Sequence, residues 1–364
     1  MWALIFGGML IISILAALYL MRGALRFGIS RKLFEKNKAL GILSSLWPVL
    51  ICLPFLFVGY IAFIVAFVHL FVFWILSDIS VFIIRKAAKK VAAKRYINGF
   101  IALSLTVVYL TYGWIMAHTV IETDYSVETD KSLGVDSLRV VAIADLHAGI
   151  TLDGDEFAEE CKRINDLKPD IVVLCGDFVD DKTSKEDMIK SCEALGDIDA
   201  TYGVYFVYGN HDRGYSENIE FTPEMLYQSL VFNGVEVLTD EVYAVTDNIY
   251  IVGREDASRH GRSSAKELME GIDPSKYIIM LDHQPRDYDA ITECAPDLVI
   301  SGHTHGGHIF PAGHIGMLMM ANDALYGLEK RGDTSFIVTS GISGWEIPFK
   351  TFTFSEIVVI DIEK

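Results

Sequence analysis

Five short motifs in the second half of the chain carry carboxylate, amide and imidazole side chains of the kind that bind metal ions. They supply Asp145 and His147, Asp177, Asn210 with His211 and Asp212, His283, and His303 with His305. Oxygen and imidazole ligands suit Mn, Fe or Zn, whereas a soft-metal site would need a thiolate, and the motifs contain none. Two ions that share a carboxylate lower the pKa of a water molecule so that it can attack phosphorus near neutral pH. The motifs therefore predict two divalent metal ions and the hydrolysis of a phosphate ester.

The position of each motif strengthens this prediction, because each motif alone is a weak signal. A lone histidine such as His283 most often has a structural role. Each motif, however, follows a short apolar run that reads as a buried strand. These runs cover residues 138–143, 171–174, 204–207, 277–280 and 298–300. Open α/β sheets place their sites at the carboxyl ends of strands, so five such ends with ligand-type residues favour one shared site.

The remaining pattern of the second half predicts a layered α/β domain over residues 138–364. Helix-like stretches at residues 156–167 and 185–195 lie between the first strands, and strands that alternate with helices are typical of such domains. Later strand-like runs have less helix between them and cover residues 235–237, 249–252, 336–339 and 356–362. We therefore expect two packed mixed sheets with helices outside, an αββα sandwich, preceded by a tether at residues 118–137 that includes the first strand.

The first 117 residues have the composition of a membrane region. Twelve of the 31 Lys and Arg residues lie there, but only two of the 48 acidic residues. The run from residue 39 to residue 84 contains no Lys or Arg, and as one helix it would be about twice as long as the hydrocarbon core is thick. We therefore expect an integral membrane protein with about four transmembrane helices, at residues 1–21, 39–58, 60–84 and 97–117.

Charge predicts the orientation of these helices and the class of partner. Two short basic loops, at residues 22–38 and 85–95, should remain in the cytoplasm. Four spans then place the domain after residue 118 outside the cytoplasm, whereas three spans would place it inside. The chain has a formal net charge of −17, which makes nucleic acid an unfavoured partner, because nucleic-acid binding relies on Lys and Arg.

Other polar residues have both a structural and a functional interpretation. Asp78 precedes Arg85 by seven residues, which suggests an ion pair at the membrane surface. His69 suggests a packing histidine, with a ligand or a proton relay as the alternative. The five cysteines form no Cys-x-x-Cys pair, so we expect buried free thiols, with a disulfide in the domain as the alternative.

The five motifs, in this order, resemble the calcineurin-like metallophosphoesterase superfamily over roughly residues 120–364. The chain looks most like the bacterial membrane-associated branch, in which some members hydrolyse UDP-diacylglucosamine and others are linked to the cell envelope. Residues 302–307 and 339–344 support that branch. His308 departs from it, because a glutamine is expected there. We interpret His308 as a polar contact to the site or the substrate, with an extra ligand or a neutral replacement as alternatives.

The resemblance implies a role for each motif residue. One metal ion would be held by Asp145, His147, Asp177 and His305, and a second by Asp177, Asn210, His283 and His303. His211 would stabilise the transition state or protonate the leaving oxygen, and Asp212 would orient its imidazole.

Four further residues are open to two interpretations. Asp180 either lies behind the ligands or caps a helix. Arg254, Asp256 and Tyr326 either line a substrate pocket or have ordinary packing and surface roles. Of these, Arg254 is our candidate for binding substrate together with His308.

Three functions fit these patterns. The first is a membrane-tethered phosphoesterase that hydrolyses a phosphodiester or phosphomonoester of an envelope lipid or of a nucleotide-linked small molecule. The second is a non-catalytic metal-binding scaffold or sensor, and the third is a channel or transporter with a metal-binding accessory domain. His211 favours the enzyme, because a purely structural metal site has no need of it. The sequence leaves open the identity of the metal, the natural substrate and the oligomeric state.

Overall fold

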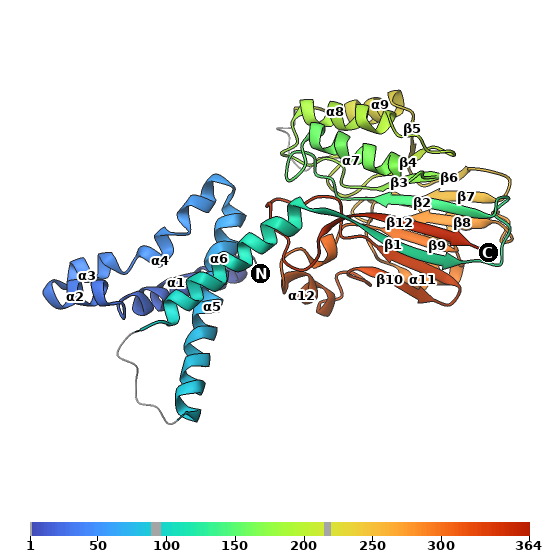
Figure 1. Ribbon diagram of the computed structural model, residues 1–364. Coiled ribbons are helices and arrows are strands. Elements are labelled where there is room, and N and C mark those ends of the chain that lie inside the picture. The colour runs from blue at the N-terminus through green and yellow to red at the C-terminus, as the bar shows by residue number, and fades with distance from the viewer. Residues whose placement is uncertain (1, 89–95, 215–219) are drawn as a thin grey trace. The chain divides into compact units, whose positions relative to one another are not determined.

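The computed structural model describes the backbone of residues 2–88, 96–214 and 220–364 (Figure 1). It divides into two compact units between Tyr112 and Gly113. The first unit is helical, and the second contains all of the described strands.

The first unit is a series of apolar helices. Its elements are α1 (Trp2–Ala24), α2 (Gly28–Lys36), α3 (Lys38–Ser44), α4 (Trp47–Leu50), the 3₁₀ helix η1 (Leu53–Phe57), α5 (Tyr60–Ala87) and most of α6 (Asn98–His118). α5 and α6, with 28 and 21 residues, are long and apolar enough to cross a membrane. α1 and α2 meet at a bend of 91° and form a third candidate span if the bent pair counts as one.

The four transmembrane helices expected from the sequence are therefore not confirmed. Residues 39–58, where the second span is expected, lie in the short helices α3, α4 and η1. Pro48 and Pro54 occupy the first turns of α4 and η1. A proline fits a first helical turn, but it lacks an N–H and clashes with the turn before it, so a single helix does not continue through these positions.

Asp78 of α5 connects three helical segments of the first unit. Its carboxylate accepts hydrogen bonds from Tyr19 (2.8 Å), Arg26 (3.1 Å), Tyr96 (3.1 Å) and Asn98 (2.6 Å). The described ion pair of Asp78 is thus made with Arg26, after α1, although the sequence points to the basic cluster that begins with Arg85 in the last turn of α5. Residues 89–95 of that later cluster lie outside the described residues.

His69 and the cysteines have the structural roles that we expected first. The Nδ1 atom of His69 bonds the carbonyl of Val65 at 2.7 Å, and its ring stacks on Tyr109. All five cysteines are free thiols, and four of them are buried.

The second unit is built on two six-stranded sheets. In the first sheet the strand order is β1 (Val120–Glu128), β12 (Ser355–Glu363), β2 (Ser137–Ile143), β3 (Ile171–Cys175), β4 (Val204–Val207) and β5 (Val235–Leu238). In the second it is β10 (Gly327–Arg331), β11 (Thr334–Val338), β9 (Leu298–Ser301), β8 (Tyr277–Leu281), β7 (Ile249–Gly253) and β6 (Glu241–Ala244). β2 to β5 are parallel, as are β7, β8, β9 and β11. β12 runs antiparallel to β2 and parallel to β1.

Helices cover both outer faces, so the α/β class expected from the sequence is confirmed. These helices are α7 (Gly154–Asp166), α8 (Lys185–Gly196), α9 (Pro223–Phe232), α10 (Ala265–Met269) and α11 (Tyr288–Cys294). Side chains such as Val140 and Ile300 fill the core between the sheets. Phe157 of α7 packs in a second core on the first sheet, and Tyr288 of α11 packs in a third on the second sheet.

The second unit begins with the last turns of α6. The backbone N–H of Lys350 donates to the carbonyl of Gly113 at 2.9 Å, and the hydroxyl of Ser355 donates to the carbonyl of Ala117 at 2.9 Å. β1 follows α6 directly and pairs with β12. The end of α6 is therefore part of the packed domain, not a free tether.

Candidate dinuclear metal centre

The ligand-type residues lie on loops that follow the carboxyl ends of β2, β3, β4, β8 and β9. Five of them have a positive φ angle: Asp145 (55°), His147 (40°), Asp177 (52°), His303 (71°) and His305 (47°). Residues other than glycine rarely adopt this backbone conformation, and each one that does raises the free energy of the folded state by on the order of 1–3 kcal/mol. The chain thus turns sharply at the end of each strand, which aims successive side chains at one point.

Two groups of side chains are arranged as metal ligands. Asp145, His147 and His305 form one group, and Asp177, His283 and His303 form the other, with ligand atoms in each group within 4.8 Å of one another. Asp177 joins the groups, because its Oδ2 lies 3.7 Å from His147 Nε2 and 3.1 Å from His283 Nε2. Asn210 Oδ1 lies 3.3 Å from His283 Nε2. The structure therefore brings together all seven residues that the sequence predicts as ligands.

Buried atoms in this cluster fit divalent metal ions. His147 Nε2 and His305 Nδ1 are buried and have no hydrogen-bond partner within the described part of the chain. A buried ring nitrogen without a partner is unfavourable, because it has lost water and gained nothing in exchange. Asp145 and Asp177 are buried carboxylates beside these nitrogens. Divalent ions would satisfy both the nitrogens and the negative charge, and the donor set suits Mn, Fe or Zn.

Contacts behind the ligands hold the rings in orientation. His283 Nδ1 bonds the carbonyl of Cys175 at 2.7 Å, which leaves Nε2 facing Asp177. His147 Nδ1 lies 3.4 Å from Asp180 Oδ2, which leaves its Nε2 toward the cluster. Metal-bound histidines commonly make such contacts through their second nitrogen. Asp180 therefore stands behind a ligand, and the helix-capping alternative is wrong, because Ser184 caps α8.

Asp212 positions two of the ligand loops. Its carboxylate accepts backbone N–H bonds from Asp177, Phe178, Val179 and Gly209, at 2.7 to 3.1 Å. At Gly209 a Cβ atom would lie 2.2 Å from Asp177 Oδ1, so only glycine fits this approach of the two loops. These contacts make Asp212 a positioning residue for the loops. Its expected role in orienting the ring of His211 stays a prediction.

His211 lies on the accessible side of the cluster. Its ring centre is 5.1 Å from that of His147 and 5.7 Å from that of Trp345, and its backbone N–H donates to Asp177 Oδ1. Burial lowers the pKa of His211 below its ordinary value, although the Asp177 carboxylate acts in the opposite direction. The ring is thus placed to contact a group bound at the cluster, although His211 belongs to neither of the two ligand groups.

The carboxylates at the centre differ in their electrostatics. Burial raises the pKa of Asp145 to about 6, although His283 opposes this effect. Burial acts in the same direction on Asp177, but His283 and His147 outweigh it and lower the pKa of that carboxyl. Asp177 is therefore the carboxylate whose negative charge is most strongly favoured, as suits a group shared between two cations.

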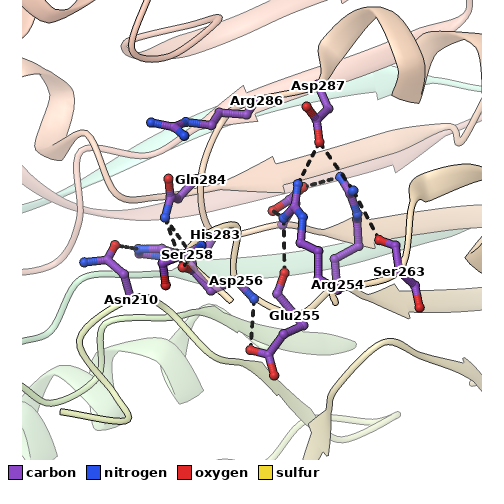
Figure 2. Close-up of polar contacts among 12 residues, drawn as sticks. Asn210, Arg254, Glu255, Asp256, Ser258, Ser263, His283, Gln284, Arg286 and Asp287 are labelled. Atoms are coloured by element: carbon purple, nitrogen blue, oxygen red, sulfur yellow. Dashed lines mark hydrogen bonds and ion pairs between the residues drawn. The ribbon is translucent and has the colours of Figure 1, made fainter. Parts of the chain in front are cut away.

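The two substrate-binding candidates have different surroundings. His308 has a φ angle of 46°, and its ring lies 5.4 Å from that of His305 and 6.2 Å from that of Trp345, beside the cluster. Arg254 is only 2% exposed and pairs with Asp282 at 2.6 Å. Figure 2 shows Arg254 in a network with Asp287, to one side of His283 and Asn210. The assignment of Arg254 to substrate is therefore corrected to a buried structural ion pair.

Asp256 and Tyr326 also have structural roles. Asp256 is buried and accepts two hydrogen bonds from the side-chain amide of Gln284, next to His283 (Figure 2). The Tyr326 hydroxyl donates to Glu356 Oε2 at 2.8 Å. These contacts support the packing interpretation of both residues.

Three further residues near the cluster were missed by sequence reasoning. Trp345 lies beside both His211 and His308. Arg286 is exposed and follows the ligand His283 by three residues, which is a signal that could have identified it. Lys350 is fully buried, and its Nζ donates to the carbonyls of Ser340 and Gly341. Nothing in its local sequence marks it as buried.

Comparisons with known proteins agree with this geometry. Residues 138–307 match the family described as calcineurin-like phosphoesterase. A Danio rerio protein named transmembrane protein with metallophosphoesterase domain is 30% identical over 299 residues, covering 77% of this chain and 66% of the relative. The protein of the same name from Bos taurus is 29% identical over 245 residues, covering 63% and 54%. An uncharacterized metallophosphoesterase from Campylobacter jejuni is 29% identical over 231 residues, covering 62% and 59%. The chain thus spans somewhat more than half the length of these relatives.

Proposed function

Because this chain belongs to the calcineurin-like metallophosphoesterase superfamily, we propose that it is a membrane-tethered, two-metal phosphoesterase that hydrolyses a phosphodiester or a phosphomonoester. The observation that carries this proposal is the pair of ligand groups that meet at Asp177, with His211 beside them. A single metal site would need only one of these groups.

Different residues of the chain would have different roles in such a reaction. The seven ligand-type residues would hold two divalent ions, which supply charge stabilisation and a nucleophilic water near neutral pH. Asp180 and the Cys175 carbonyl keep the rings of His147 and His283 in orientation. Asp212 fixes the loops that carry Asp177 and Asn210. His211 stabilises charge on the phosphoryl oxygens or donates a proton to the leaving oxygen.

A non-catalytic scaffold is the main alternative. Its metal ions would need ligands, but not a further imidazole of lowered pKa on the accessible side of the cluster. His211 has this placement and this shift, which favours the enzyme. The channel or transporter alternative would lead us to expect buried charges along the spans. Among the described residues of the first unit, the Asp78 carboxylate is only partly buried, and its neighbours satisfy it.

The candidate transmembrane helices bear on where the reaction takes place. α5 and α6 are candidate spans, and the Danio rerio and Bos taurus relatives are named transmembrane proteins. We propose a multi-pass protein with its catalytic domain outside the cytoplasm, because α6 follows the basic residues 85–95, which should remain in the cytoplasm. The substrate would be an envelope lipid or a nucleotide-linked small molecule, because the acidic second unit disfavours nucleic acid.

The test is hydrolysis of bis-p-nitrophenyl phosphate and p-nitrophenyl phosphate by the full chain in detergent, metal-stripped and then supplied with Mn²⁺. The full chain is needed because Gly113 and Ala117 at the end of α6 bond the domain. We expect metal-dependent turnover that falls at least 100-fold in His211→Ala and in Asp177→Asn. Asp289→Asn, which changes an exposed carboxylate, is the matched control. A folded, metal-loaded chain that turns over neither compound would support the scaffold instead.

A further inference from the structure

Residues 309–322 form an apolar segment beside the metal centre. The segment contains no Asp, Glu, Lys or Arg and includes the short helix α12 (Ala312–Leu318). Its large exposed side chains are Phe310 (49%), Ile315 (50%), Leu318 (83%), Met319 (76%) and Met320 (92%). A continuous apolar surface of this kind is unusual on a soluble domain and marks a site of interaction.

This apolar segment packs directly on the loop that carries His305. At Gly313 of α12, a Cβ atom would lie 2.4 Å from Gly307 Cα. Gly307 is the last residue of the 3₁₀ turn η2 (His305–Gly307). The helix and the ligand turn are therefore in backbone contact, and the apolar surface adjoins the metal centre.

The same segment is bonded to the strand connection that holds the end of α6. The backbone N–H of Thr351 donates to the carbonyl of His308 at 2.8 Å, and the N–H of Phe310 donates to Thr351 Oγ1 at 2.9 Å. The preceding residue, Lys350, donates its N–H to the carbonyl of Gly113. Figure 1 shows α12 at the end of the two sheets where α6 enters the second unit. The apolar segment thus lies where the chain passes from a candidate transmembrane helix into the domain.

An exposed cation, Arg286, contacts the end of this segment. Arg286 Nε bonds the side-chain oxygen of Asn322, at the end of the apolar segment, at 3.5 Å. In Figure 2 the guanidinium extends toward the side of Asn210 and His283, away from the network around Arg254. An exposed guanidinium at this place is suited to bind a phosphate in two-point fashion.

We propose that residues 309–322 insert into the surface of the bilayer next to α6, and that Arg286 binds the phosphate of a membrane lipid at the metal centre. The inference rests on the proposed phosphoesterase function and narrows its substrate to a phosphate ester anchored in the membrane. The bilayer is the favoured occupant because Gly113, near the end of the candidate transmembrane helix α6, is bonded to Lys350, next to the Thr351 that bonds the segment. The segment also has no Asp, Glu, Lys or Arg to pair with a protein partner. Apolar side chains beside a membrane anchor bind the lipid surface through burial of their apolar area.

The first test measures depth in the membrane without using activity. A nitroxide is attached at Leu318→Cys in the full chain, with Cys294→Ser, since the other cysteines are buried. The chain is placed in vesicles of phosphatidylcholine and phosphatidylglycerol. We expect the label to be more accessible to oxygen than to a water-soluble nickel chelate. Phe232→Cys on α9, also an exposed apolar position at 90%, is the control and should favour the chelate.

Two results of the depth measurement would overturn the inference. A label at residue 318 that is as accessible to the chelate as the label at residue 232 would show that the segment stays in water. A label at residue 318 that is protected from both reagents would show that a protein, such as a second copy of the chain, covers the segment.

The second test compares one reaction on two carriers. Hexadecyl p-nitrophenyl phosphate in vesicles is the anchored substrate, and bis-p-nitrophenyl phosphate is the soluble one. In the triple variant Leu318→Ser, Met319→Ser, Met320→Ser, we expect the ratio of anchored to soluble turnover to fall at least tenfold. In Arg286→Gln, we expect the KM for the anchored substrate to rise. Phe232→Ser should leave both rates unchanged.

The outcomes separate the two proposals. If the wild-type chain hydrolyses neither compound, the phosphoesterase function fails, and the depth measurement still decides the membrane surface. If it hydrolyses the soluble compound but the triple variant keeps the wild-type ratio, the membrane inference alone is wrong.

Discussion

At the scale of single residues, the metal centre depends on backbone conformations that are unfavourable in isolation. The positive φ angles of five ligand-type residues are maintained by fixed contacts around them. His303 donates its backbone N–H to both oxygens of Asp145 at 3.0 Å, and Asp212 accepts four backbone N–H bonds. Such local cost is tolerated at functional sites because the surrounding structure determines the conformation. The ligands are therefore in place as a consequence of folding.

Lys350 gives a prediction about pH at this scale. Burial lowers the pKa of its ammonium from 10.5 to about 7. Between these two values the unfolded chain binds a proton that the folded chain does not, so the free energy of unfolding rises with pH across this window. The slope from this one group is about 1.4 kcal/mol per pH unit. Below about pH 7 both states are protonated and the contribution no longer changes.

The measurement is the difference in free energy of unfolding between wild type and Lys350→Met, in detergent, at pH 7, 8 and 9. We expect the wild type to gain stability relative to the variant as pH rises. Lys182→Met, an exposed lysine of the same domain, should show no such trend against wild type. Parallel pH profiles for wild type and Lys350→Met would contradict the assignment.

At the scale of elements, α12 and the ligand turn η2 behave as one packed pair. Replacing Gly313 with alanine would place a methyl group 2.4 Å from Gly307 Cα, so helix or turn must move. We expect Gly313→Ala to lower turnover on a soluble phosphodiester at least tenfold, because His305 moves with the turn. Gly316→Ala in the same helix is the control, since its Cβ would lie 3.9 Å from the nearest atom. Equal activity of the two variants would show that η2 does not depend on α12.

The helices and strands also show which parts of the fold could be predicted from the sequence. Strands β2, β3, β4, β8 and β9 lie where short apolar runs predicted them, because a fully buried strand needs continuous apolar side chains. The motifs after them therefore pointed to one place. The span expected at residues 39–58 is not confirmed, because hydrophobicity reports burial in lipid and not helix continuity, which Pro48 and Pro54 interrupt.

Residue types alone could not assign the roles of several polar side chains. Arg254 follows a strand end, as a substrate contact would, but tertiary packing places Asp282 beside it and buries both. Lys350 looks like a surface lysine in sequence, yet carbonyls of Ser340 and Gly341 surround its ammonium. These partners are distant along the chain or lie on loops, so only the folded structure identifies them.

At the scale of the whole molecule, metal ions should contribute to the stability of the second unit but not of the first. Without them, buried ring nitrogens such as His147 Nε2 lack a hydrogen-bond partner among the described residues, and the buried carboxylates Asp145 and Asp177 repel each other. A ligand present at about 100 times its Kd adds roughly 2.7 kcal/mol. For a unit of this size that shifts Tm by roughly 5–10 °C.

This effect is measured by thermal unfolding of the full chain in detergent, with a chelator and then with Mn²⁺. We expect the transition of the second unit to move upward with Mn²⁺, and Asp177→Asn to reduce the shift. A Tm that is the same in chelator and in Mn²⁺ would argue against a metal centre in this cluster.

The place of β12 in the first sheet has a consequence for biosynthesis. β12 lies between β1 and β2, yet it is the last of the described strands to leave the ribosome. While β2 to β5 can pair as they emerge, β1 stays without its neighbour in the sheet until translation reaches β12. An unpaired strand edge invites wrong pairing, so this period is when the growing chain is most open to aggregation or to help from a chaperone. Every metal ligand is synthesised before this final step, but the sheet that supports them is closed only by it.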